Sequence, residues 1–260
     1  NMILFTNGDS WTQGDSPAQT LNWEAKKTLD WYNIVPFFGQ FYKHINDEGE
    51  VDPMLDTKAE YKFYDSPVWP KELGSRLGVE TWNAGRLGDG NADIKSSTIQ
   101  SIEWLKKQGK KDIFAVIGWS SIIRVPIYTV DCEGKTQVDQ QRPDKYAAAN
   151  DIYRKTNYIQ NEFLQHILDL QNYFKVNNVN YLMFNAFDHF LDFDNHFLSP
   201  AIDRTKWINH TVKPAHFKEY IYQKFKLNNW DESPYFTTAH PRDVSHIAWA
   251  KYLYNYIQSL

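Results

Sequence analysis

Four short apolar segments alternate along this chain with longer segments of helical periodicity. The apolar segments cover residues 2–5, 81–83, 112–118 and 179–187. Their short length and mostly apolar composition are typical of strands buried in a parallel sheet. Helices are predicted over residues 66–78, 93–110, 145–175, 213–226 and 244–258. This alternation predicts an α/β fold in which a doubly wound parallel sheet carries helices on both faces.

Three longer segments show neither the pattern of a strand nor the periodicity of a helix. They cover residues 15–64, 123–144 and 188–212. Open α/β sheets bind ligands at the carboxyl ends of their strands, so segments inserted after strands are expected to stand over the active-site edge. We interpret them as a lid or substrate walls within one domain of 260 residues. For the first segment, a small helical subdomain that only packs against the sheet is the alternative.

Gly8-Asp9-Ser10 follows the first predicted strand. A serine at that point lies at the carboxyl edge of the sheet, where its hydroxyl is a candidate nucleophile. The alternative is structural, because Asp9 and Ser10 both suit the cap of a following helix. Spacing alone does not choose between these two interpretations.

Further short motifs occur in a fixed order along the chain. Residues 83–88 read Asn-Ala-Gly-Arg-Leu-Gly, residues 118–121 read Gly-Trp-Ser-Ser, and His240-Pro241 lies near the carboxyl end. Together with Gly8-Asp9-Ser10 they follow the block order of the SGNH (GDSL-type) hydrolases, and the chain resembles a divergent member of that superfamily. The resemblance implies a flavodoxin-like fold of three layers, α/β/α, and a serine esterase that needs no cofactor and no metal.

The resemblance also implies a role for each matching residue. Ser10 is the expected nucleophile and His240 the expected general base. Oxyanion donors are expected at the backbone N–H groups of Ser10 and Gly88. His246 competes with His240 because Asp243 precedes it by three positions, but it falls within the last predicted helix. A surface or capping role is the structural alternative for His240.

The chain departs from the superfamily pattern at two positions. Ser120 stands where the pattern has an asparagine, so a hydroxyl replaces the amide as the third oxyanion donor; losing such a donor lowers the rate about 100- to 1000-fold. Thr237 stands where an aspartate normally orients the histidine. We place Asp188, at the end of the fourth predicted strand, first among the substitutes. The alternatives are Asp231, Glu232, a Ser-His dyad oriented by a backbone carbonyl, and a degenerate site.

Aromatic residues make up 16% of the chain, with 10 Trp, and many fall in segments expected to be loops. Trp11 and Trp119 adjoin the predicted nucleophile and donor, and we assign them to substrate binding together with Asp9 and Arg124. A surface ion pair is the alternative for Arg124. Because aromatic faces stack on pyranose rings, an O-acetyl group on a carbohydrate is the predicted ester, and a lipid-like acyl chain is the alternative. A glycan-binding module without catalysis and an acyltransferase are the competing functions.

Composition narrows the classes of partner. The formal charge of −4 gives no basic surface for nucleic acid. No apolar run approaches the roughly 20 residues that cross a bilayer, and the start lacks a secretory signal, so a soluble, cytoplasmic protein without a membrane partner is expected. Asn1 in place of Met indicates a trimmed chain, which leaves the compartment open. The oligomeric state does not follow from the sequence.

Cys132 is the only cysteine, so an intrachain disulfide is excluded and a Cys/His zinc site is not expected. Asp and His recur within residues 188–196, and both are suitable metal ligands. An ordinary solvated loop is the simpler interpretation of that segment.

Overall fold

The computed structural model describes residues 2–13, 40–42, 67–86, 89–122, 126–130, 136–140, 158–187, 196–208, 216–228, 235–237 and 240–260. Its centre is a five-stranded sheet with the order β2-β3-β1-β4-β7. The strands are β1 (Ile3–Asn7), β2 (Gln40–Tyr42), β3 (Glu80–Asn83), β4 (Ile113–Trp119) and β7 (Asn180–Asn185). All run parallel except β2, which is antiparallel to β3 at one edge. The parallel order β3-β1-β4-β7 is the flavodoxin-like order that the sequence predicts.

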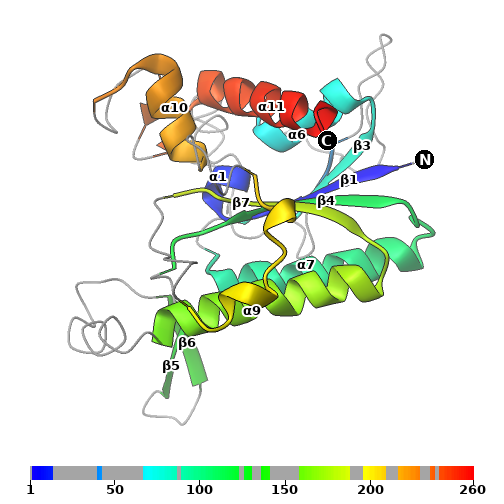
Figure 1. Cartoon of the computed structure of the whole chain (residues 1–260), viewed down its shortest axis with the longest axis vertical. Coiled ribbons are helices and arrows are strands. Elements are labelled where there is room, and N and C mark those ends of the chain that lie inside the picture. Colours follow the sequence, from blue (N-terminus) through cyan, green and yellow to red (C-terminus); the bar gives the residue numbers. More distant parts are fainter. Residues whose placement is uncertain are drawn as a thin grey trace, which may run out of the picture.

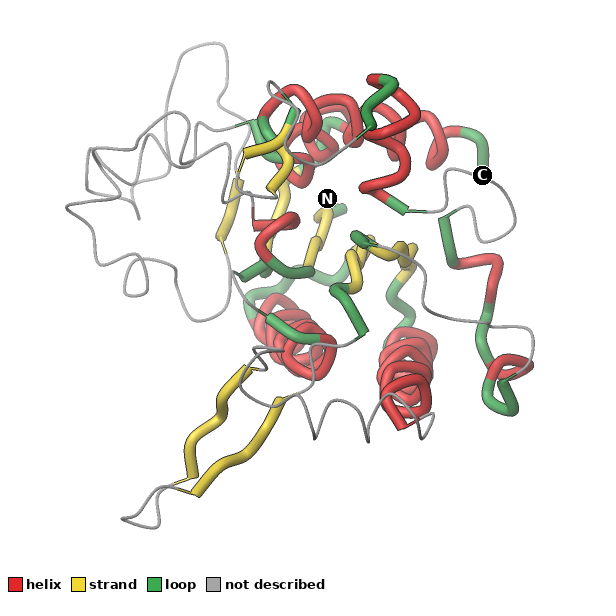
Figure 2. Tube along the Cα trace, turned by 90° about the vertical axis from the view of Figure 1, so that its left-hand side faces the viewer, coloured by secondary structure: helices red, strands yellow, loops and turns green. Residues whose placement is uncertain are grey.

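Helices cover both faces of the sheet (Figure 1). One face carries α7 (Asn91–Lys107) and α9 (Tyr158–Val176), which lie side by side in Figure 2. The other face carries α6 (Trp69–Leu77), α10 (Phe217–Phe225) and α11 (Asp243–Gln258). The predicted three-layer α/β/α fold is therefore confirmed. None of the helices in the described part of the chain is both long and apolar enough to cross a membrane.

The four parallel strands are largely buried on both faces, which explains their mostly apolar sequences. Ile3 and Phe5 pack in the cluster formed with α7 and α9, while Leu4 between them packs in the cluster formed with α6 and α11. Burying a side chain of this size stabilises the fold by roughly 1.5–3 kcal/mol. Because β1 is buried at all five positions, it fixes the centre of the sheet and the place where the chain leaves it.

Parts of the first and third predicted insertions join the body of the fold. β2 belongs to the first insertion and extends the sheet by pairing with β3. In the third, Trp207 forms a parallel bridge with Met183 of β7 and is 4% exposed. These parts build the two edges of the sheet. The second contains the hairpin of β5 (Pro126–Val130) and β6 (Thr136–Gln140), which points away from the sheet (Figures 1 and 2).

Helix boundaries follow the caps. α7 begins at Asn91, earlier than predicted, and the Gly90 N–H donates to Asp93 Oδ2 at 3.2 Å as in one half of a capping box. α10 begins later than predicted, at Phe217, because His216 caps it by accepting the Glu219 N–H at 3.1 Å. α9 begins at Tyr158; the predicted start of that helix lies outside the described residues.

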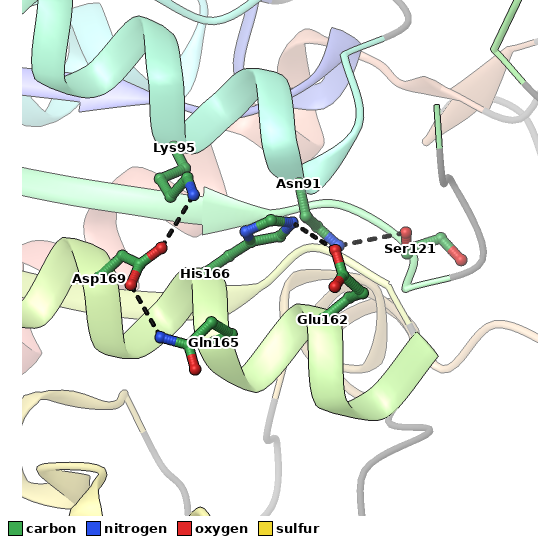
Figure 3. A network of polar contacts seen from close by, with 7 residues as sticks. All are labelled: Asn91, Lys95, Ser121, Glu162, Gln165, His166 and Asp169. Carbon is green, nitrogen blue, oxygen red and sulfur yellow. Dashed lines mark hydrogen bonds and ion pairs between the residues drawn. The ribbon is translucent and has the colours of Figure 1, made fainter. Parts of the chain in front are cut away.

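Polar side chains join α7 to α9 (Figure 3). Lys95 Nζ lies 2.9 Å from Asp169 Oδ2, and Gln165 donates to the other carboxylate oxygen at 2.9 Å. His166 Nε2 lies 4.0 Å from Glu162 Oε2. Burial, and next the Lys95 ammonium, lower the pKa of His166, so its ring is neutral at neutral pH. The partly exposed ion pair links the two helices but adds little stability.

A buried histidine joins α11 to α6. His246 is fully buried, and its Nδ1 accepts the Trp69 N–H at 3.1 Å. Burial lowers the pKa of His246 to about 3; the neighbouring His240 adds to this shift, and the Pro241 carbonyl opposes it. The His246 ring is therefore neutral in the folded protein over most of the pH range.

We expect acid to destabilise the fold through His246. The unfolded chain has the ordinary histidine pKa of 6.5, so between pH 6.5 and about 3 it binds a proton that the folded protein does not. This contribution to stability is complete above pH 6.5 and falls by about 1.4 kcal/mol for each pH unit below it. Urea unfolding at pH 7 and pH 5 should show a loss of about 2 kcal/mol from this residue.

His246→Asn is the matched control, because its Oδ1 can accept the Trp69 N–H but the amide does not titrate. We expect this variant to be less stable than the wild type at pH 7 and to lose about 2 kcal/mol less between pH 7 and pH 5. The lowered pKa of His166 acts on both proteins and cancels. The same pH dependence in both proteins would contradict the role given to His246.

Candidate functional site

The candidate nucleophile lies in a short turn between β1 and α1 (Ser10–Gln13). Ser10 is 1% exposed. Asp9 accepts the Trp11 N–H through Oδ1 at 3.0 Å, and the Asp9 carbonyl accepts the Thr12 N–H at 2.9 Å. Asp9 therefore caps the turn, which is the structural alternative that the sequence offers for this residue. The hydroxyl of Ser10 takes no part in the capping.

The candidate base reaches this turn from the far end of the chain. A two-stranded hairpin carries it, formed by β8 (Phe236–Thr237) and β9 (His240–Pro241). The Arg242 N–H donates to the Tyr235 carbonyl at 2.8 Å and closes the hairpin. His240 Nε2 lies 2.9 Å from Ser10 Oγ, which is hydrogen-bonding distance between residues 230 positions apart.

The competing histidine does not share this position. His246 is buried within α11, and the Trp69 N–H occupies its Nδ1. Its low pKa keeps it neutral. Of the two histidines, His240 is the one that contacts Ser10.

The backbone N–H of Ser10 is the candidate oxyanion donor of this turn. Among the residues that the structure describes, none accepts a hydrogen bond from it, although Ser10 is 1% exposed. A buried N–H group with no partner is rare in proteins. The next two N–H groups, of Trp11 and Thr12, are both taken up by Asp9. The Ser10 N–H is thus the donor that stays available at the start of α1.

Gly8 lets the turn approach β4 closely. A Cβ on Gly8 would lie 2.7 Å from the Gly118 carbonyl oxygen and 2.1 Å from Thr12 Oγ1. Contacts this short exclude any side chain, so the position requires glycine. The Gly8 carbonyl accepts the Arg86 N–H at 3.1 Å, which ties the chain after β3 to the same turn.

Two asparagine side chains hold the turn from neighbouring elements. Asn7 accepts the Gly8 N–H at 2.8 Å and donates to Thr98 Oγ1 of α7 at 2.8 Å. Asn83, at the end of β3, donates to the Thr12 carbonyl at 3.1 Å. The role of Asn7 was not predicted, although a polar residue that ends an apolar strand is a signal for it.

Ser120, the predicted third oxyanion donor, lies directly after β4 and is 3% exposed. Its hydroxyl donates to Asp9 Oδ2 at 2.8 Å. Its backbone N–H donates to Oδ1 of Asn91, the first residue of α7, at 2.9 Å. The structure therefore brings Ser120 to the nucleophile turn, but directs its one hydroxyl proton at Asp9.

Three residues predicted to bind substrate are buried instead. Trp11 and Trp119 are 1% and 0% exposed. The Trp11 ring packs edge-to-face on Phe217 and the Trp119 ring on Phe163, each at 5.4 Å between ring centroids. Neither ring presents a face to a ligand, so their assignment to substrate binding is wrong. Asp9 is 0% exposed and hydrogen-bonded within the turn, and its assignment is corrected in the same way.

Other predicted site residues lie outside the part of the chain that the structure describes. They are Gly88, Arg124, Asp188, Asp231 and Glu232, together with the side chain of Thr237. Of the segment weighed as a metal site, only His196 is described, and its Nε2 contacts Asn161 Oδ1. Within the described residues, no group of three or more His, Cys, Asp or Glu side chains could hold a metal ion.

Comparison with known proteins gives two likenesses. A search of curated proteins found no match. Among solved structures, the chain is similar to a member of the lipolytic protein G-D-S-L family from Veillonella parvula DSM 2008, with 12% identity and a TM-score of 0.41 over 100% of both chains. A family model matches residues 44–211, a range that contains neither Ser10 nor His240. Because this match covers more than half of the sequence, the chain belongs to that family, a family of unknown function (DUF6071).

Proposed function

We propose that this chain is a serine hydrolase that cleaves carboxylic esters through an acyl-enzyme on Ser10. The observation that carries the proposal is the 2.9 Å contact between Ser10 Oγ and His240 Nε2. Few purely structural arrangements require a serine and a histidine so far apart in sequence to meet at the carboxyl edge of a parallel sheet, where α/β enzymes bind ligands.

In the proposed reaction, Ser10 Oγ attacks the ester carbonyl carbon while its proton moves to His240 Nε2. The protonated ring then gives this proton to the leaving alkoxide, and the alcohol departs from the acyl-enzyme. Water attacks the acyl carbonyl next, with His240 taking the water proton. The ring returns the proton to Ser10 Oγ as the carboxylic acid leaves, so both residues regain their starting states.

The negative charge that develops on the carbonyl oxygen needs donors that are already in place. The Ser10 N–H supports this role, because it is buried and no described residue accepts its hydrogen bond. The Gly88 N–H is the proposed second donor and stays a prediction from the resemblance. Both would be backbone groups.

The residue that orients His240 stays a prediction. We place it at Asp188, which follows β7 by three positions. Phe187, the neighbouring residue, packs on Trp11 with 4.6 Å between ring centroids, and Trp11 adjoins Ser10. This contact places the end of β7 beside the nucleophile turn and supports Asp188 over Asp231 and Glu232.

The proposed substrate is a carboxylic ester of one of two classes. An O-acetylated carbohydrate stays the first class to test, although the burial of Trp11 and Trp119 removes two of the aromatic rings on which a sugar would stack. A lipid-like acyl ester is the second class. An acyltransferase would use the same acyl-enzyme with an alcohol in place of water, and a glycan-binding module would use none of this chemistry.

We expect Ser10→Ala to abolish turnover of p-nitrophenyl acetate. Loss of the nucleophile should lower kcat/KM by at least about 1000-fold, because the remaining site offers only binding and an oxyanion donor. Ser259→Ala, an exposed serine at the end of α11, is the matched control and should keep the wild-type rate. Equal rates for wild type and Ser10→Ala would end the nucleophile assignment.

A serine-reactive fluorophosphonate separates the hydrolase from the binding module. We expect one label per wild-type chain, mapped by peptide mass spectrometry to Ser10, and no label in Ser10→Ala. His240→Ala should label at least about 100-fold more slowly, because the hydroxyl loses its general base. A wild-type chain that stays unlabelled while binding a glycan would favour the non-catalytic module.

Asp188→Asn tests the orienting carboxylate. Replacing the acid of a triad by its amide lowers kcat by roughly 10,000-fold with little effect on folding, and we expect a loss of this order for p-nitrophenyl acetate. Asp192→Asn in the same segment is the control and should be close to wild type. Unchanged activity in Asp188→Asn would remove Asp188 and leave the dyad or the other two acids.

A further inference from the structure

The Ser120 hydroxyl donates its hydrogen bond to the buried carboxylate of Asp9. The Asp9 carboxylate is 0% exposed; Oδ2 accepts the Ser120 hydroxyl at 2.8 Å, and Oδ1 accepts the Trp11 N–H at 3.0 Å. A carboxylate withdrawn from water depends on such donors. If Ser120 turned its only proton towards a substrate oxygen, Asp9 would lose one of them.

The backbone on both sides of Ser120 is fixed by one side chain. Asn91 is 4% exposed, and its Oδ1 accepts the Ser120 N–H at 2.9 Å. Its Nδ2 lies 3.3 Å from the carbonyl oxygens of both Ser120 and Ser121. Figure 3 shows the Asn91 amide reaching from the start of α7 to Ser121. The carboxamide therefore uses its acceptor and its donor group on the same short loop.

Asn91 itself starts from a fixed position. α7 is tied to the end of β1, where Asn7 donates to the Ile94 carbonyl at 3.0 Å and to Thr98 Oγ1 at 2.8 Å. It is tied to α9 by the contact of Lys95 with Asp169 (Figure 3). The path from α7 through Asn91 and Ser120 to the nucleophile turn thus consists of short, buried hydrogen bonds.

We propose that Ser120 and Asn91 are positioning residues that act on catalysis through Asp9, and that Ser120 is not an oxyanion donor. The Asn91 side chain positions Ser120, and the Ser120 hydroxyl positions the Asp9 carboxylate. Asp9 in turn accepts hydrogen bonds from the N–H groups of Trp11 and Thr12. The Ser10 N–H is then the group left to face the reacting carbonyl. This inference rests on the proposed function.

A double-mutant cycle tests the proposal. Asp9→Asn keeps the shape of the side chain; since its oxygen is needed by the Trp11 N–H, the amide group faces Ser120 and no longer accepts its proton. Ser120→Ala removes the hydroxyl. The kcat and KM of wild type, both single variants and the double variant are measured with p-nitrophenyl acetate. Each kcat is divided by the fraction of sites titrated with fluorophosphonate, so that loss of folded protein does not count as loss of catalysis.

If Ser120 acts through Asp9, each single variant should lower kcat by about 10- to 100-fold through misplacement of the turn, with KM changed by about 2-fold or less. The kcat of the double variant should then be no lower than the kcat of the less active single variant. If Ser120 contacts the oxyanion itself, Ser120→Ala should cost about 100- to 1000-fold in either background, and the two losses should multiply. Multiplying losses would overturn the proposal.

Asn91→Asp is the second variant, in case a substitution at Asp9 impairs folding. It keeps the oxygen that accepts the Ser120 N–H but removes the donors to the two carbonyls. It should lower kcat without raising KM and should not add to the loss in Ser120→Ala; independent losses would contradict the path. A wild type no faster than Ser10→Ala would instead refute the proposed function, and this inference with it.

Discussion

The turn that carries Ser10 leaves the sheet between two buried strand ends, and Asp9 and Ser10 are 0% and 1% exposed there. Gly8 approaches the Gly118 carbonyl so closely that no side chain fits. Most peptide groups at such a point need a partner inside the protein, because an unpaired buried group costs about 1–3 kcal/mol. Asn7 and Asn83 supply these partners from the ends of β1 and β3. The rest of the candidate site depends on this turn, in which no described residue accepts the Ser10 N–H, since the turn decides where the Ser10 hydroxyl and N–H point.

The placement of His240 depends on a different part of the molecule. Its hairpin is held at the start of α11, and α11 packs on the sheet through aromatic contacts. Trp249 stacks on Phe217 with 4.9 Å between centroids and meets Phe184 of β7 at 5.1 Å. The hydrogen bond from Trp69 to His246 then fixes α11 against α6. The core on this face thus brings the carboxyl end of the chain to the serine turn.

Where the SGNH pattern has an asparagine, this chain has Ser120, which joins the loop after β4 to the turn that carries Ser10. An asparagine can reach a substrate oxygen, whereas the shorter Ser120 side chain hydrogen-bonds to Asp9. In the proposed mechanism, this contact holds the nucleophile turn in place, and backbone N–H groups stabilise the oxyanion. Backbone donors require no side-chain ordering during the reaction, so such a site can function with fewer groups, at a lower rate.

The sequence by itself determined the layers, because buried strands and amphipathic helices impose their periods on every residue. The order of the parallel strands agrees with the flavodoxin-like fold that the resemblance implies. Through the resemblance the sequence also pointed to Ser10 and His240, whose side chains lie 2.9 Å apart. It did not determine which side chains lie in the core: Trp11 and Trp119 read as ligand-binding residues but are buried, because burial depends on elements distant in sequence. The hydrogen bonds that Asn7, Asn83 and Asn91 make to backbone groups around the site were likewise decided by tertiary structure. A side-chain amide that pairs with a backbone group 87 positions away leaves no local pattern in the chain.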